Sequence, residues 1–153
     1  MIVKSIDTVE SELNSSGIFA SVTQGTSMQP LFKTHRDMVV LTVPKRELKK
    51  YDVVLYRLSS GKYVLHRIVK VLPTKYLIRG DNTYHLEHIE KDRIIAVLTE
   101  FIRKGKKHTV DDVSFKIYSR VWNFIYPVRL LYVRSIALLY KIYRAIFKRG
   151  KNK

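Results

Sequence analysis

The segment VTQGTSMQPLF, residues 22–32, places a single serine between a glycine and a proline. A serine hydroxyl is a weak nucleophile until a neighbouring base accepts its proton. Ser27 is therefore either an ordinary turn residue or a nucleophile that a bent backbone exposes. The choice depends on which base the rest of the chain supplies.

Two further blocks offer a base and an acid. The run YVLHRIVKV, residues 63–71, puts His66 within a strand-like segment, and the run YLIRGDN, residues 76–82, presents Asp81 directly after a glycine. Each residue alone has an ordinary interpretation, as a strand histidine or a turn aspartate. Together with Ser27 they match the logic of a triad, in which a carboxylate orients the histidine that activates a nucleophile.

The order and neighbours of these blocks resemble the type I signal peptidase clan, whose fold self-cleaving repressors share. The resemblance is closest to the histidine-containing archaeal and endoplasmic-reticulum type, and it covers residues 18–102. The matching segments are Ser27-Met28-Gln29-Pro30, Asp37-Met38-Val39, Asp52-Val53-Val54, His66-Arg67-Ile68-Val69 and Gly80-Asp81-Asn82. The resemblance implies a serine endopeptidase that cleaves signal or leader peptides through an acyl-enzyme. Ser27 would be the nucleophile, His66 the base and Asp81 the orienting acid.

The sequence departs from the family pattern at the acid. The endoplasmic-reticulum type carries a further aspartate shortly after Gly-Asp-Asn, and the candidates here are Glu87 and Asp92. Both remain alternatives to Asp81 as the acid that contacts His66.

The sequence also departs from the pattern at the oxyanion site, because Gly25 occupies the position where many signal peptidases have a serine donor. We expect the Ser27 N–H to point at the developing oxyanion, with Thr26 as a candidate second donor. Met28 is expected to pack beneath the loop or to form part of the substrate wall.

A histidine base needs less desolvation than the lysine of the usual bacterial enzymes. An unperturbed histidine has a pKa of about 6.5, whereas that of a lysine is about 10.4 and must be lowered by burial. Lys62 and Lys70 are alternative bases, but both are more simply solvent-facing strand residues.

The segment around residue 87 also raises the alternative of a metal site. His85 and His88, with Glu87 and Glu90, could be imagined as ligands, but no further ligand box accompanies them. We expect no metal and no other cofactor. The chain has no cysteine, which excludes disulfides and thiol catalysis.

Short strands are predicted to position these residues. Segments rich in β-branched and aromatic residues lie at 18–24, 37–43, 52–58, 62–72, 75–80 and 93–102, with a hairpin turn at 59–62. An amphipathic helix is predicted before them, with Ile2, Ile6, Val9 and Leu13 on one face. The expected fold is mainly β, a coiled antiparallel peptidase body in residues 1–112 of the type found in signal peptidases. A basic helical tail, residues 113–153, is expected to follow it.

The charge is concentrated in that tail. The chain has a net charge of +16, and no acidic residue follows Asp112. A helix is predicted at 114–126 and a second one after Pro127. In the second helix, Tyr132, Ile136, Leu139, Tyr143 and Ile146 recur at helical spacing, opposite Arg134, Lys141, Arg144 and Lys148.

The longest uncharged stretch of the tail, residues 121–128, is too short to span a bilayer. A helix with cations on one side and apolar residues on the other is instead typical of an anionic membrane surface. We expect peripheral attachment through the tail, in place of the family's usual N-terminal anchor and with no secretory signal. The expected location is the cytoplasmic face, and the expected partner is a peptide or protein with a cleavable leader. The alternatives are a catalytically silent peptide- or membrane-binding protein and a phosphate-directed nucleic-acid binder, although nucleic acid is not the expected partner.

Overall fold

The computed structural model describes the backbone of residues 6–149 and the side chains of residues 9–144. The chain divides into two units, residues 1–120 and 121–153. The elements are α1 (Ile6–Ser16), β1 (Ile18–Val22), β2 (Met38–Thr42), β3 (Val53–Arg57), β4 (Tyr63–Val71), β5 (Lys75–Arg79), β6 (Glu87–Glu90), the 3-10 helix η1 (Lys91–Arg93), β7 (Ile94–Arg103), β8 (Lys106–Thr109), α2 (Val113–Phe124) and α3 (Tyr126–Arg149).

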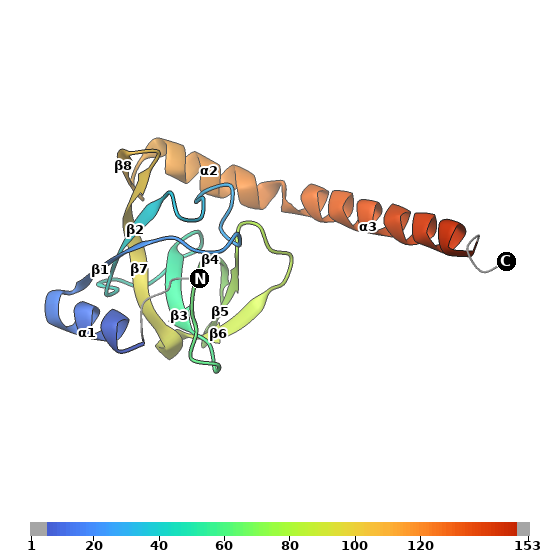
Figure 1. The fold of residues 1–153 in the computed structure, drawn as a ribbon. Coiled ribbons are helices and arrows are strands. Elements are labelled where there is room, and N and C mark those ends of the chain that lie inside the picture. The colour runs from blue at the N-terminus through green and yellow to red at the C-terminus, as the bar shows by residue number, and fades with distance from the viewer. Residues whose placement is uncertain (1–5, 150–153) are drawn as a thin grey trace. The chain divides into compact units, whose positions relative to one another are not determined.

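The strands form one antiparallel sheet in the order β1-β2-β7-β3-β4-β5-β6, and β8 pairs with β7 (Figure 1). All six predicted strands are confirmed, as is the turn at 59–62, where the Leu58 N–H donates to the Lys62 carbonyl at 2.9 Å. Irregularities in pairing occur in β2, β3 and β4. Such bulges bend a strand and increase its twist. The first unit is thus mainly antiparallel β, as the sequence predicts.

Both faces of the central strands are buried. In β3, Val53 and Leu55 belong to one core cluster, and the alternate residues Val54 and Tyr56 belong to the other. This follows from strand geometry, because successive side chains point to opposite faces. The alternation continues in β4, where His66 lies opposite Val54 and Arg67 lies opposite Val53. The two neighbouring polar residues therefore point to opposite faces of the sheet.

The N-terminal helix α1 packs through its predicted apolar face. Val9 and Leu13 are buried in the core. The helix ends at Gly17, which has a φ of 72° and donates its N–H to the Leu13 carbonyl at 2.9 Å. Glycine favours this left-handed position at a helix end. Ile2 and the side chain of Ile6 lie outside the described residues.

The first compact unit extends to residue 120, whereas the sequence places the end of the peptidase body at residue 112. The first turns of α2 belong to the body, because Phe115 and Ser119 are buried against it. The hydrophobic period of this segment indicated a helix correctly. It could not indicate that two turns of the helix would be covered.

The second unit contains the end of α2 and the whole of α3. Two helices are present as predicted, but the break between them lies at Ile125, because α2 ends at Phe124 and Pro127 is the second residue of α3. Proline is tolerated there because the first helical turn has no intrahelical partner for its N–H groups. Within the part of α3 whose side chains are described, residues 131–144 are all exposed, so both the apolar and the cationic residues face outward. The side chains of Ile146 and Lys148 lie outside the described residues. Among the described helices, none is sufficiently long and apolar to cross a membrane.

Candidate active site

The loop that carries Ser27 is closed by hydrogen bonds at its base. The Thr23 N–H donates to the Asp37 carbonyl at 2.9 Å, and the His35 N–H donates to the Thr23 carbonyl at 2.9 Å. The Asp37 carboxylate is fully buried. It accepts hydrogen bonds from the Lys33 N–H and from Nε and Nη2 of Arg36, each at 2.7 Å. Burial is the largest single influence on the pKa of Asp37 and raises it, but the hydrogen bonds together outweigh burial and lower the pKa. The acid therefore stays ionised and holds the loop.

The Ser27 loop meets the turn after β5 through backbone contacts. The Asn82 N–H donates to the Ser27 carbonyl at 2.7 Å, and the Asn82 side chain donates to the Thr26 carbonyl at 3.3 Å. A Cβ at Gly80 would lie 2.6 Å from the Ser27 carbonyl oxygen and 2.9 Å from His66 Nε2. Any side chain at position 80 would therefore force these segments apart, and glycine allows their close approach.

His66 contributes the third part of this junction. Its ring is buried, and Nδ1 lies 3.0 Å from Glu87 Oε1 and 3.0 Å from the Tyr56 hydroxyl oxygen. An ionised carboxylate can only accept a hydrogen bond, so Nδ1 carries a hydrogen and donates a hydrogen bond to Glu87. Nε2 is then left with its lone pair. It is buried and makes no hydrogen bond with any described residue, so the Ser27 hydroxyl is not bonded to it in this structure.

Tyr56 and Glu87 support each other beside the imidazole. Hydrogen bonds from His66 and Tyr56 lower the pKa of Glu87, with the His66 bond as the largest cause. Burial and the nearby Glu87 charge raise the pKa of Tyr56 well above its ordinary value. Glu87 is therefore an anion and Tyr56 a neutral donor across the neutral pH range.

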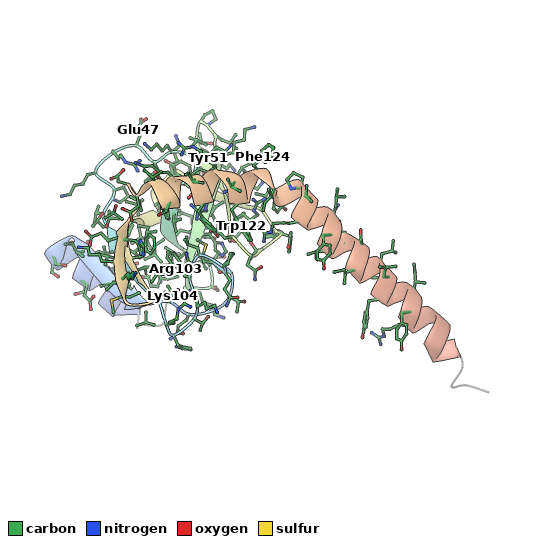
Figure 2. The ribbon with its side chains drawn as sticks, turned by 90° about the horizontal axis from the view of Figure 1, so that it is seen from above. Glu47, Tyr51, Arg103, Lys104, Trp122 and Phe124 are labelled. Carbon is green, nitrogen blue, oxygen red and sulfur yellow. The ribbon has the colours of Figure 1, made fainter. Side chains whose placement is uncertain are left out.

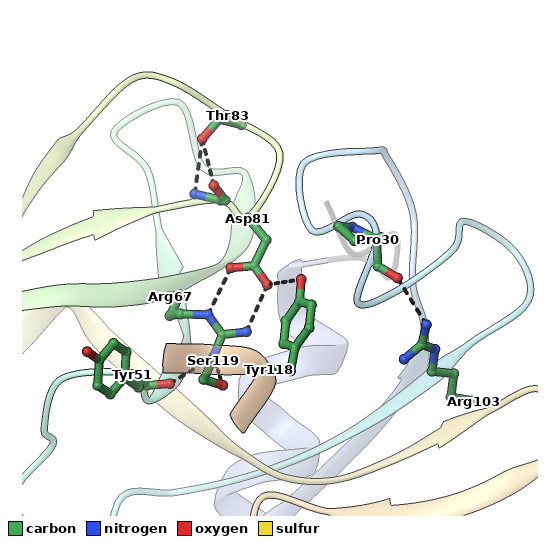
Figure 3. A network of polar contacts seen from close by, with 9 residues as sticks. Pro30, Tyr51, Arg67, Asp81, Thr83, Arg103, Tyr118 and Ser119 are labelled. Atoms are coloured by element: carbon green, nitrogen blue, oxygen red, sulfur yellow. Dashed lines mark hydrogen bonds and ion pairs between the residues drawn. The ribbon is translucent and has the colours of Figure 1, made fainter. Parts of the chain in front are cut away.

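The structure corrects the assignment of Asp81 as the acid that orients His66. Both Asp81 oxygens accept from Arg67, with Nε to Oδ1 and Nη2 to Oδ2 each at 2.8 Å, and the Tyr118 hydroxyl donates to Oδ2 at 3.0 Å (Figure 3). The acid at His66 is instead Glu87, one of the two alternatives. The physical reason is that His66 and Arg67 point to opposite faces of β4.

Arg67 is fully buried and gathers several segments. Its Nη1 donates to the Tyr51 carbonyl at 3.0 Å and to the Ser119 hydroxyl at 2.7 Å, and its guanidinium lies over the Phe115 and Tyr118 rings. Asp81 is thus a positioning residue. It ties the turn that contacts Ser27 to β4 and α2.

Two of the other predicted loop residues, Gly25 and Met28, line a small hollow beside Ser27, and Thr26 does not. This hollow has a volume of about 10 Å³, room for roughly one water molecule. Gly25 has a φ of 78°, and Met28 is buried in the core beneath the loop, as expected of a packing residue. Thr26 is exposed, and its carbonyl accepts the Gln29 N–H at 3.1 Å. The hollow is lined by Thr23, Gln24, Gly25, Ser27, Met28, Phe32 and Leu65.

The remaining candidates lie apart from this junction. Asp92 is exposed in η1 and lines a different surface hollow with Glu10 and Arg57. Lys62 and Lys70 are exposed. Across the described residues, no three histidine or acidic side chains are placed to hold a metal ion.

Sequence reasoning missed Tyr56 and the role of Arg67. A signal for Tyr56 was present, because it shares a face of β3 with Val54, the residue opposite His66. Arg67 was visible only as the neighbour of His66, and nothing in the sequence indicated that Tyr118 and Ser119 would reach it from α2.

A scan of the sequence against protein-family models matches no family, and a search of curated proteins finds no relative. The site must therefore be interpreted from its own geometry.

Replacing Asp81 by asparagine is expected to destabilise the first unit by about 3–5 kcal/mol, because the buried Arg67 guanidinium would lose its counter-charge. Urea unfolding at pH 7 measures this free energy. The control is Asp92→Asn, an exposed position where we expect a change within about 0.5 kcal/mol. Equal unfolding free energies for the two variants would contradict the assigned role of Asp81.

Proposed function

We propose that this chain is a serine endopeptidase of the signal peptidase type that cleaves extended leader peptides. The observation that carries the proposal is the buried Nε2 of His66. It has no hydrogen-bond partner among the described residues, and it lies against the glycine that also contacts the Ser27 carbonyl. A buried nitrogen with a lone pair is costly to leave unpaired, and functional sites are where such costs persist.

The proposed chemistry uses both ring nitrogens of His66. Ser27 Oγ attacks the substrate carbonyl while Nε2 accepts its proton, and the amine leaves with that proton as the amide C–N bond breaks. Water then attacks the acyl-enzyme, and Nε2 again accepts and returns a proton. Ser27 makes no hydrogen bond to Nε2 in this structure, and catalytic hydrogen bonds often close only when substrate is bound.

Glu87 would stabilise the imidazolium that forms during each step. It accepts from Nδ1 at 3.0 Å, which fixes the tautomer, and its lowered pKa keeps it ionised. This is the role of the acid in a Ser-His-Asp triad, with a glutamate in its place. The Ser27 N–H remains our candidate oxyanion donor.

The surroundings of Ser27 favour a peptide with a small side chain before the scissile bond. The adjoining hollow of about 10 Å³ has no room for a large residue. β1 forms one edge of the sheet and leads into the Ser27 loop. An extended peptide can add to such an edge through its backbone.

The second unit supports action at an anionic membrane surface. Leu131, Ile136 and Leu139 are 65%, 48% and 65% exposed, and the cations Arg134 and Lys141 are exposed on the same helix. A helix with this pattern lies in the bilayer interface, with its apolar side chains in the lipid and its cations at the head groups.

Ser27→Ala is expected to abolish cleavage without unfolding the protein, because it removes only the nucleophile. Wild type and variant are incubated with candidate leader peptides, and the products are identified by mass spectrometry. His66→Ala should behave alike, whereas Ser60→Ala, at an exposed position in the turn between β3 and β4, should retain activity. Full cleavage by Ser27→Ala would dispose of the mechanism.

Glu87→Gln is expected to lower kcat by about 10²-fold or more, since the carboxylate no longer stabilises the imidazolium. Asp92→Asn is the matched control and should cleave as wild type does.

The lowered pKa of Glu87 adds a stability test. The advantage of wild type over Glu87→Gln should be present above the ordinary glutamate pKa of 4.5 and should vanish as pH falls through the lower folded value. Urea unfolding at pH 7 and near pH 3 compares the two, and an advantage that grows at the acid pH would contradict the assignment.

Replacing Arg134, Lys141 and Arg144 together by glutamine is expected to lower binding to phosphatidylglycerol vesicles by at least about tenfold, because each cation near the surface adds roughly 1 kcal/mol. Vesicle co-sedimentation at fixed salt measures the change. Lys62→Gln with Lys70→Gln and Lys75→Gln removes the same charge from the first unit and should have little effect. If duplex DNA displaced the wild type from vesicles at physiological salt, the nucleic-acid alternative would replace the membrane proposal.

A further inference from the structure

A cavity much larger than the hollow beside Ser27 lies elsewhere in the first unit. It is bounded by the loop of residues 43–52, the strands β2, β3 and β7 and the first turns of α2, and its volume is about 530 Å³. Figure 2 shows this loop by its labelled residues Glu47 and Tyr51. The volume falls within the range of small-molecule sites, whereas the hollow beside Ser27 is far below it.

The rim of this cavity is strongly cationic. Its charged lining residues are the cations Lys45, Arg46, Lys49, Lys50, Lys116 and Arg120 and the acids Asp52 and Asp111. Each acid is paired with a rim cation. Arg46 donates to both oxygens of Asp52 at 2.8 and 2.9 Å, and Lys116 Nζ lies 2.9 Å from Asp111. Four cations therefore remain in excess around the opening.

The floor of the cavity is apolar. Val53 and Leu98 are buried in the core, and Phe115 and Val97 are 7% and 8% exposed. Val43 adds an exposed apolar wall on the loop. A hydrophobic floor beneath a ring of cations suits a ligand that has an anionic head and an apolar chain.

We propose that this cavity, which we call the loop–α2 cavity, binds one molecule of an anionic single-chain amphiphile. The chain lies on Val53, Val97 and Phe115, and the phosphate or carboxylate head lies among Lys45, Lys49 and Arg120. The two parts of the ligand match the two parts of the cavity. An inorganic anion would contact the cations but not the apolar floor, and a neutral chain would leave the cations without a counter-charge.

Isothermal titration calorimetry of the full chain with octyl phosphate, below its micelle concentration and at fixed salt, tests the proposal. Inorganic phosphate supplies the head alone, and octanol supplies the chain alone. We expect octyl phosphate to bind with one-to-one stoichiometry and at least tenfold more tightly than either. Equal affinity for inorganic phosphate, or for octanol, would overturn the proposal.

Variants locate the binding. Lys45→Gln with Lys49→Gln should weaken octyl phosphate binding by about tenfold, and Val43→Glu, which places an acid on the exposed wall, should weaken it similarly. Lys62→Gln with Lys70→Gln removes the same charge elsewhere and should leave the affinity unchanged. An equal loss in this control would assign the binding to net charge and overturn the site. Tighter binding of a glutamate-rich peptide than of octyl phosphate would also overturn it, in favour of a protein partner.

Discussion

The geometry of the candidate active site depends on the buried ion pair between Arg67 and Asp81. A guanidinium with no exposed surface is tolerated only if a charge and hydrogen bonds compensate its lost hydration. Asp81 supplies the charge through two bonds of 2.8 Å. This pairing holds the turn that begins at Gly80 against β4. Asn82, which directly follows Asp81 in that turn, donates its N–H to the Ser27 carbonyl. The position of the Ser27 loop thus follows from a pair that takes no part in the proposed proton transfer.

Two different acids bind the neighbouring residues His66 and Arg67 of β4. Strand alternation separates them, because His66 and Arg67 are neighbours on β4 and point to opposite faces. Glu87 meets the imidazole on one face, and Asp81 meets the guanidinium on the other. Both interactions anchor the same strand from opposite sides. These contacts fix Nδ1 and Arg67, so the position of the His66 ring on β4 is set from both faces of the sheet.

Local sequence patterns predicted the strands and helices well, because alternation and helical spacing are properties of short segments. They could not decide which acid meets His66, because that contact depends on pairing between β5 and β6. The segment EHIE of β6 is too polar to indicate a strand, yet its register places Glu87 opposite Ile78. The burial of the first turns of α2 could not be predicted for a related reason. Phe115 and Ser119 are buried by partners from distant parts of the chain, and helical period alone does not report burial.

Arg67 also connects the site to the loop–α2 cavity. The Tyr51 carbonyl and the Ser119 hydroxyl accept from its Nη1, and both residues line that cavity. The other edge of the same planar guanidinium binds Asp81. A rigid fork cannot turn toward one set of acceptors without changing its geometry toward the other. The cavity wall and the turn that contacts Ser27 are therefore held in register by one side chain, and each of them limits the positions that the other can adopt.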